Sequence, residues 1–391
     1  MSPEAKALFK EMKQEIGRFG ESIQLRVRPD AKDAPTKVIA AAMSAAAQNK
    51  SLEELAKPVF EMSADTMFYH LQSKLDLEVI EAAMEHNVRR GIQIGLRLAK
   101  HRHFSLAIDF HDEYTHTEHK ENPYVVGTKP GRGTSYCFKY MTVALTTPGF
   151  RYMLFAYPVE KFTGEMDGKI HHTDMILLLN RALDFVRRLG VSFNMLCLDK
   201  EFSSTDVVAL LSEVEIRFIT PAKQDKKFLE QVKRCPSIPA IVEGWKMSND
   251  RREEVQTTLA ILREMDEGDD EPRIYGYITS LPKEEFASDP NVLSRIYAHR
   301  WGIETNHRML ENFEIATTTP DGIVRYFFFV VSMVLFNIWV WTNAQLQKGP
   351  FKPMEFKIKI KASEINFIFV LLMLEWMSGV VLDETDPAQA I

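Results

Sequence analysis

The stretch FSLAIDFHDEYTH, residues 104–116, marks the point at which the sequence changes from helical to extended character. Its apolar start and its Phe, Ile, Tyr and Thr residues are typical of a β-strand whose beginning is buried. Asp109 interrupts the apolar run. Because a carboxylate beside a buried sheet is costly without compensation, Asp109 is expected to cap a turn, to form a salt bridge or to bind a metal ion.

The segments after this strand alternate between strands and helices. Stretches rich in Tyr, Phe, Val and Thr predict strands, and Pro148–Gly149 predicts a turn between two of them. We expect strands at 136–148, 150–160, 193–202 and 216–223. We expect helices between them at 173–190 and 203–213. Together with the first strand, this order predicts an α/β protein with a mixed sheet flanked by helices.

The rest of the chain divides into regions of different character. Residues 1–103 read as short helices, one of them starting with a capping box formed by Ser51 and Glu54, and predict an N-terminal helical domain. After it we expect the first part of the core at 104–221 and a charged β-rich insertion at 222–287. The second part of the core, with further helices, follows at 288–345, and a tail with a helix at 346–391. The N-terminal helices suit a DNA-binding domain or a structural cap equally well.

The composition limits the class of protein. A net charge of −6 and a pI near 6.0 argue against a protein that simply coats nucleic acid, since such domains are usually basic. Basic stretches at 99–103, 223–234 and 348–361 are sufficient to contact a phosphate backbone, although a solvated surface is the simpler interpretation. The three cysteines lack short spacings and the N-terminus is not signal-like, so a cytoplasmic protein is expected.

Two apolar segments, 323–343 and 365–382, have the length of a membrane-spanning helix. The first contains Arg325 and Asn337, and the second contains Glu375 near its middle. A charged side chain at the centre of a bilayer costs about 3 kcal/mol. We therefore expect both segments to be helices buried in a protein core, with no membrane partner.

A second acidic candidate lies in YAHRWGIETNHRMLENF, residues 297–313. On one continuous helix, Tyr297, Arg300, Glu304 and Glu311 would form a single polar stripe, because they stand at positions i, i+3, i+7 and i+14. The packed face would consist of the apolar residues Leu293, Ile296, Ile303 and Leu310. A glutamate one turn after an arginine suits a structural salt bridge or one ligand of a metal site.

A third acid, Asp199, follows a short apolar strand in MLCLDKEF. The first and fourth strands of such a sheet can be neighbours, which would place Asp109 and Asp199 side by side. Glu304, from a helix packed across the sheet, would then complete a cage of three carboxylates. Carboxylate oxygens suit Mg²⁺, and two such ions can promote phosphodiester transfer. The simpler alternative for each aspartate is a turn, a cap or a salt bridge to Lys200 or Arg300.

Three segments, AIDFHDE, LDKEF and YAHRWGIE, together resemble the signature of the DDE transposases of the insertion-sequence 4 type. The resemblance covers about residues 104–345. It implies an RNase H-like core with an all-β insertion between the second aspartate and the glutamate. It also implies that Asp109, Asp199 and Glu304 are catalytic ligands of Mg²⁺ or Mn²⁺, with two ions in the site.

The most specific part of the resemblance is a Tyr-x2-Arg-x3-Glu-x6-Lys motif on the last catalytic helix. It implies that Tyr297 and Arg300 position a DNA phosphate and support Glu304. The final Lys of the motif is Glu311 in this chain, and an acid cannot make the phosphate contact expected of that lysine. Arg308, one turn earlier, is expected to make it instead, with the neighbouring histidine as the alternative.

The resemblance implies a transposase that binds double-stranded DNA, both the terminal inverted repeats of its element and the target. It would cleave one strand to free a 3′-hydroxyl, which then attacks another strand, and it would act as a homodimer. Two alternatives stay open. One is an RNase H-like nuclease that does not join strands; the other is a catalytically impaired or domesticated DNA-binding relative, which Glu311 favours.

The histidines of the first strand allow a weaker, zinc-binding interpretation. His111, His116 and His119 lie among acids, but this segment reads as a strand leaving the sheet rather than a helix that would bring them together. Asp112 could replace Asp109 as the first acid, although its offset of three residues places it beyond the strand.

Overall fold

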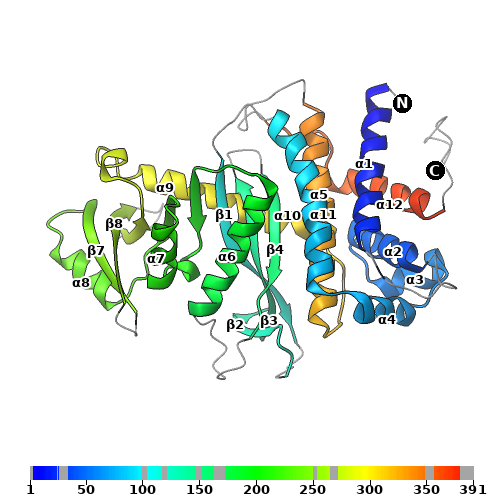
Figure 1. The fold of residues 1–391 in the computed structure, drawn as a ribbon, viewed down its shortest axis with the longest axis horizontal. Coiled ribbons are helices and arrows are strands. Elements are labelled where there is room, and N and C mark those ends of the chain that lie inside the picture. The colour runs from blue at the N-terminus through cyan, green and yellow to red at the C-terminus, as the bar shows by residue number, and fades with distance from the viewer. Residues whose placement is uncertain are drawn as a thin grey trace. The chain divides into compact units, whose positions relative to one another are not determined.

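The computed structural model describes most of the chain, at residues 3–23, 25, 34–98, 104–116, 121–146, 151–161, 172–249, 253–264, 272–347 and 356–378. The chain folds into two compact units, each assembled from separated segments. Met1–His101, Thr115–Val125 and Thr305–Ile391 form the helical unit. Arg102–Tyr114 and Val126–Glu304 form the sheet unit. Figure 1 labels the elements of both.

Nine strands of the described chain form one sheet, in the order β2-β3-β1-β5-β6-β9-β8-β7 with β4 paired to β3. They are β1 (Ser105–Thr115), β2 (Val125–Gly131), β3 (Thr134–Thr146), β4 (Arg151–Pro158), β5 (Met195–Leu198), β6 (Phe218–Pro221), β7 (Ala240–Ser248), β8 (Glu254–Glu264) and β9 (Arg273–Thr279). The predicted turn at Pro148–Gly149 lies outside the described residues.

The centre of the sheet is parallel and joins distant parts of the chain. Residues 105–108 of β1 pair with 195–198 of β5, and β5 pairs in parallel with β6. The expected neighbourhood of the first strand and the strand before Asp199 is therefore confirmed. The sequence does not predict β2, because its Gly, Lys and Pro weaken the strand pattern; as an edge strand it tolerates them.

The β-rich insertion extends this same sheet. Its strand β9 pairs antiparallel with β6, and β8 and β7 follow in antiparallel order. The predicted α/β class is confirmed, with a mixed sheet, a β-rich insertion and helices at the N-terminus.

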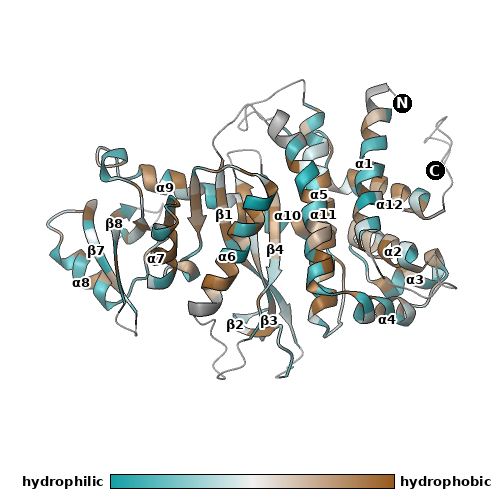
Figure 2. Ribbon diagram, viewed as in Figure 1, coloured by the Kyte–Doolittle hydropathy of each residue, from teal (hydrophilic) through white to brown (hydrophobic). Residues whose placement is uncertain are grey.

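Helices cover the sheet within its unit: α6 (His172–Leu189), α7 (Thr205–Glu213), α8 (Lys226–Arg234) and α9 (Val292–Tyr297). Of these, α6 packs on β4 and α7 packs on β8, and Figure 2 colours their apolar residues brown. The Ser204 hydroxyl accepts a hydrogen bond from the Val207 N–H and starts α7. Gly190, with φ at +69°, ends α6 in a left-handed conformation that glycine adopts without strain.

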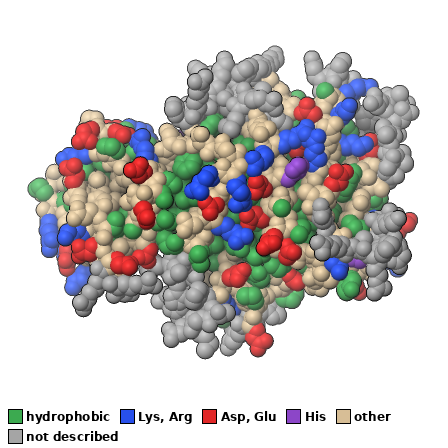
Figure 3. Space-filling view, viewed as in Figure 1, with side chains coloured by type: hydrophobic (Ala, Val, Ile, Leu, Met, Phe, Trp, Pro, Cys, Tyr) green, Lys and Arg blue, Asp and Glu red, His purple; other side chains and the backbone are tan. Residues whose placement is uncertain are grey.

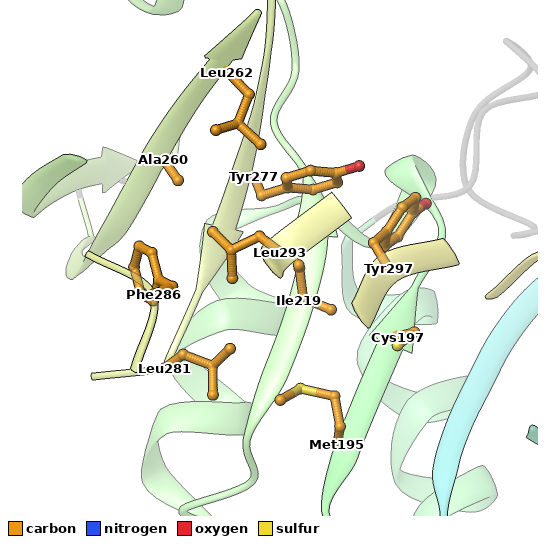
Figure 4. Close-up of a cluster of buried hydrophobic side chains, with 10 residues drawn as sticks. All are labelled: Met195, Cys197, Ile219, Ala260, Leu262, Tyr277, Leu281, Phe286, Leu293 and Tyr297. Carbon is orange, nitrogen blue, oxygen red and sulfur yellow. The ribbon is translucent and has the colours of Figure 1, made fainter. Parts of the chain in front are cut away.

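A cluster of buried apolar side chains holds α9 on the sheet (Figure 4). Leu293 and Tyr297 are the contributions of α9 to this cluster. The other members come from β5, β6, β8, β9 and the segment after β9, and are Met195, Cys197, Ile219, Ala260, Leu262, Tyr277, Leu281 and Phe286. This packing fixes the start of the segment that carries the predicted arginine and glutamate.

The single helix expected over 297–313 is interrupted. α9 ends at Tyr297, a 3₁₀ turn covers Ala298–Arg300, α10 covers Trp301–Leu310, and a second 3₁₀ turn covers Glu311–Phe313. The expectation of one continuous stripe is therefore wrong, because Glu311 lies beyond the end of α10. In a 3₁₀ turn the side chains at i and i+3 eclipse one another, which brings Arg300 close to Tyr297.

The helical unit contains α1 (Pro3–Ser22), α2 (Ala34–Gln48), α3 (Leu52–Phe60), α4 (Ala64–Lys74), α5 (Leu77–Leu98), α11 (Gly322–Gln345) and α12 (Ala362–Ser378). α11 packs against α1, α2, α4 and α5, and α12 packs against α1 and α2. The predicted capping box of Ser51 and Glu54 begins α3.

Among the described helices, α11 has the length and composition of a membrane span, but 94% of its apolar window is buried inside the protein. The charged side chain near its start has a partner, since the Arg325 Nε donates to the Thr319 carbonyl oxygen at 2.6 Å. On α12, the Glu375 carboxylate lies 2.5 Å from the Lys13 Nζ. The expected burial is observed for α11. The second segment is only partly buried in α12, where Phe367 is exposed, and its last residues lie outside the described part of the chain.

Candidate active site

Asp109 and Asp199 lie on neighbouring strands of the sheet unit. Asp109 is in the middle of β1, where buried residues give way to half-buried ones, and Asp199 directly follows β5. Because Ile108 and Leu198 are register partners, the two aspartates are the next pair along the parallel strands. The Asp199 N–H donates to the Ile108 carbonyl oxygen at 3.1 Å, which continues the ladder to the acids.

Two buried threonines hold the main chain at these acids. The Thr142 hydroxyl on β3 donates to the Asp109 carbonyl oxygen at 3.1 Å. The Thr220 hydroxyl on β6 donates to the Asp199 carbonyl oxygen at 3.1 Å. Neither threonine was predicted from the sequence, although a polar residue inside an apolar strand is a usable signal.

The Arg300 guanidinium brings the three predicted acids together. Its Nη1 donates to the Asp109 Oδ2 at 2.5 Å and lies 3.7 Å from the Asp199 Oδ1. Its Nη2 donates to the Glu304 Oε1 at 2.5 Å. All four side chains belong to the sheet unit. The salt bridge to Arg300 that was considered for the aspartates is therefore present, and the cage of three carboxylates around a metal ion stays a prediction.

Tyr297, the last residue of α9, lies against the Arg300 side chain. The guanidinium carbon of Arg300 lies 5.3 Å from the centroid of the Tyr297 ring, within the range of a cation–π interaction. The Tyr297 ring lies beside that of Tyr277 on β9, with centroids 5.0 Å apart, at the edge of the apolar cluster (Figure 4). The insertion strand β9 thus contributes indirectly to the position of Arg300.

The charges of the site are strongly coupled. Burial raises the pKa of the Asp109 carboxyl to about 7; Arg300 lowers it, and Asp199 and Glu304 raise it. Burial would lower the pKa of Arg300, but Tyr297 and the three acids raise it above its ordinary value. The two shifts are compatible, because Arg300 faces three acids whereas Asp109 faces one cation and two like charges. One guanidinium therefore leaves negative charge uncompensated when all three acids are ionised.

The donor set fits a hard divalent cation. Asp109, Asp199 and Glu304 offer only carboxylate oxygens, which Mg²⁺ and Mn²⁺ prefer. As the side chains stand, no group of three acidic, histidine or cysteine residues in the described chain is arranged to hold a metal ion. The Arg300 guanidinium lies among the three carboxylates.

A second network, missed by the sequence analysis, ties β3 to the turn after β5. Lys139 is a buried cation on β3, and its Nζ lies 3.5 Å from the Asp112 Oδ1 and 3.4 Å from the Glu201 Oε2. It also lies 5.1 Å from the ring centroid of Phe110, which stacks on Phe202 at 5.0 Å. A lone lysine within the apolar run YCFKYMTVAL is the signal that could have revealed it.

Gly302 lets α10 approach the sheet. A Cβ atom at this position would lie 3.1 Å from the Thr146 Cγ2 and 3.2 Å from the Arg151 Nε, both tighter than ordinary contacts. Since Gly302 stands between Arg300 and Glu304, its small size permits the close packing that holds both side chains at the acids.

The remaining candidates do not join this cluster. Asp112 accepts a hydrogen bond from the Thr128 hydroxyl at 2.5 Å and pairs with Lys139, so it does not replace Asp109. Arg308 and Glu311 are exposed and belong to the helical unit. His119 lies outside the described residues, and within them the other histidines form no metal group.

Comparison with known proteins adds an independent observation. A family model described as transposase DDE domain matches residues 106–333, which is more than half of the chain. The matched region begins within β1, before Asp109, and ends within α11, after Glu304. It therefore includes all three acids and the β-rich insertion. No curated protein matches the chain.

Proposed function

We propose, from the premise that this chain belongs to the transposase DDE domain family, that its acidic site cleaves DNA phosphodiester bonds during transposition. The observation that carries the proposal is the convergence of Asp109, Asp199 and Glu304 on one guanidinium at the centre of the sheet. Acids brought together from two strands and a helix are costly to bury, and a structural role alone needs only one of them beside Arg300.

Asp109, Asp199 and Glu304 would hold two ions of Mg²⁺ or Mn²⁺. Bound there, the metal supplies positive charge that activates the attacking oxygen and stabilises the leaving oxygen. The protein's own part is to aim the three carboxylates at one point. Thr142 and Thr220 hold the two aspartate main chains for this purpose.

Arg300, Tyr297 and Arg308 are proposed to position DNA phosphate. Arg300 presents a planar set of donors that suits phosphate oxygens, and the Tyr297 ring supports it. Arg308 is exposed on α10 and is available to the backbone of DNA. On the face drawn in Figure 3, basic and acidic side chains of the described residues are interspersed.

The finer proposal is a transposase of the insertion-sequence 4 type. It would bind the terminal inverted repeats through the helices of residues 1–103, cleave to free a 3′-hydroxyl, and join that hydroxyl to target DNA as a homodimer in the cytoplasm. The Tyr-x2-Arg-x3-Glu spacing supports this type. The alternative is an impaired DNA-binding relative, which the exposed Glu311 at the lysine position favours. A nuclease that does not join strands is separated from both by an assay of strand joining.

The test is cleavage of DNA carrying the element's own ends, with and without Mg²⁺, by the wild-type chain and Glu304→Gln. Because charge stabilisation by a metal is worth several kcal/mol, the variant should lose at least about a hundredfold in rate while still binding the ends. Glu213→Gln, an exposed position at the end of α7, is the matched control and should cleave normally.

Three results are distinguishable. Cleavage by Glu213→Gln but not by Glu304→Gln supports the three-carboxylate site. Equal cleavage by all three chains removes Glu304 from it. End binding without cleavage by the wild type favours the impaired relative.

A further inference from the structure

We infer that Arg300 is an internal counter-ion that holds the three carboxylates in place until a divalent cation displaces it, so that loading of the metal and release of the guanidinium toward DNA are one event. The inference rests on the proposed function. It goes beyond it by assigning Arg300 a positioning role before DNA binds, in addition to any contact with phosphate.

The way Arg300 divides its hydrogen bonds is the first observation. A permanent arginine–carboxylate pair commonly uses two parallel N–H groups on one carboxylate. Here Nη1 serves Asp109 and approaches Asp199, while Nη2 serves Glu304. Arg300 therefore offers each acid only one nitrogen, and an ion at the same place could take over these contacts. Asp109 and Asp199 would keep their second partners, the N–H groups of Phe110 and Glu201.

The buried Nε of Arg300 is the second observation. It has no hydrogen-bond partner among the described residues. An unpaired buried donor costs free energy that a fully satisfied structural bridge would not lose. The metal-free arrangement is thus less favourable than a fully hydrogen-bonded salt bridge. Displacement of Arg300 by an ion would let its Nε find a partner and would recover part of this free energy.

Charge gives the direction of the exchange. Three carboxylates face one positive charge, and a divalent ion compensates two. Carboxylate oxygens are also the ligands that hard divalent ions prefer, and such an ion carries its charge on one atom, whereas the guanidinium spreads a single charge over several. The Tyr297 ring provides an aromatic face beside which the released guanidinium can stay close to the site.

The experiment measures Mn²⁺ binding by calorimetry and thermal unfolding with and without Mn²⁺, in the absence of DNA. Arg300→Gln should bind Mn²⁺ on the order of tenfold more tightly than the wild type, because the competing cation is gone. Without metal the variant should melt at a lower temperature, and Mn²⁺ should raise its Tm more than that of the wild type. Arg295→Gln, an exposed arginine on α9 paired with Asp289, is the matched control and should change neither quantity.

Equal or weaker Mn²⁺ binding by Arg300→Gln overturns the inference. If that variant does not fold without metal, Arg300→Lys decides: a lysine keeps the charge but cannot reach three acids, so tighter binding than the wild type is again expected, and unchanged or weaker binding overturns the inference.

Asp199→Asn separates the two levels of failure. Binding of Mn²⁺ to the wild type that Asp199→Asn does not weaken would contradict the metal site itself, and with it the proposed function. Binding that depends on Asp199 but does not respond to Arg300 would remove only the counter-ion role.

Discussion

Asp109 lies where two requirements conflict. Its strand is buried, which disfavours a charged side chain, whereas the proposed chemistry requires an ionised carboxylate. Arg300 relieves the conflict only in part, since Asp199 and Glu304 compete for the same guanidinium. The titration of this one carboxyl should therefore be visible in the stability of the whole protein.

The pKa of Asp109 is raised in the folded protein to about 7, from 3.8. The folded state thus retains the proton that the unfolded state releases first, so this stabilisation is fully present below pH 4 and is lost as the pH rises to 7. The free energy of unfolding should fall by on the order of a few kcal/mol across this range. Urea denaturation at a series of pH values across this same range, in metal-free buffer, measures it.

Asp109→Asn should remove this part of the pH dependence, because the amide does not titrate. Asp184→Asn, at an exposed surface pair with Arg187, should keep the wild-type slope. The interpretation is wrong if the slope of Asp109→Asn equals that of the wild type.

At the scale of elements, the 3₁₀ turn Lys200–Phe202 after β5 connects the second acid to the rest of the sheet. The Asp199 carboxylate accepts from the Glu201 N–H at 3.1 Å, and Glu201 reaches Lys139 on β3. The stacked rings of Phe110 and Phe202 join the same turn to β1. The turn is thereby held against β1, which carries the first acid, and against its neighbour β3.

Lys139→Met should destabilise the protein by about 1–3 kcal/mol, because it leaves Asp112 partly buried without its cation. The partly exposed Glu201 adds little to this cost. Urea denaturation at pH 7 gives the measurement. Lys246→Met, at an exposed pair with Glu254, should stay within about 0.5 kcal/mol of the wild type. Equal stability of the two variants would show that the buried lysine is not a structural anchor.

At the scale of the molecule, neither unit is a continuous stretch of chain. The apolar helix α11 is buried against α1, α2, α4 and α5, which precede it by more than two hundred residues. The N-terminal helices thus cover a later part of the chain whatever their role in binding DNA.

A fragment of residues 104–391 should therefore be insoluble or aggregated, since it exposes the apolar side of α11 that the missing helices bury. Size-exclusion chromatography of the soluble fraction, beside the full-length chain, tests this. A monomeric fragment with undiminished helix content by circular dichroism would contradict it.

The sequence by itself determined the features that depend on residues close together along the chain. Apolar runs and turn residues predicted most strands and helices, and the interrupted runs at Asp109 and Asp199 marked acids that needed compensation. Because the capping box at Ser51 and the apolar pattern of α11 are local, they were readable without the fold. The catalytic role of the acids stays a prediction.

Only the tertiary structure decided which groups meet. It placed β5 beside β1, attached the insertion to β6 through β9, and broke the expected helix with a 3₁₀ turn at Ala298–Arg300. It also revealed Lys139 as a buried anchor and Arg300 as the cation shared by three acids. The physical reason is that strand pairing and burial join residues about a hundred positions apart or more, and no local pattern of side chains records which distant charge will be the partner.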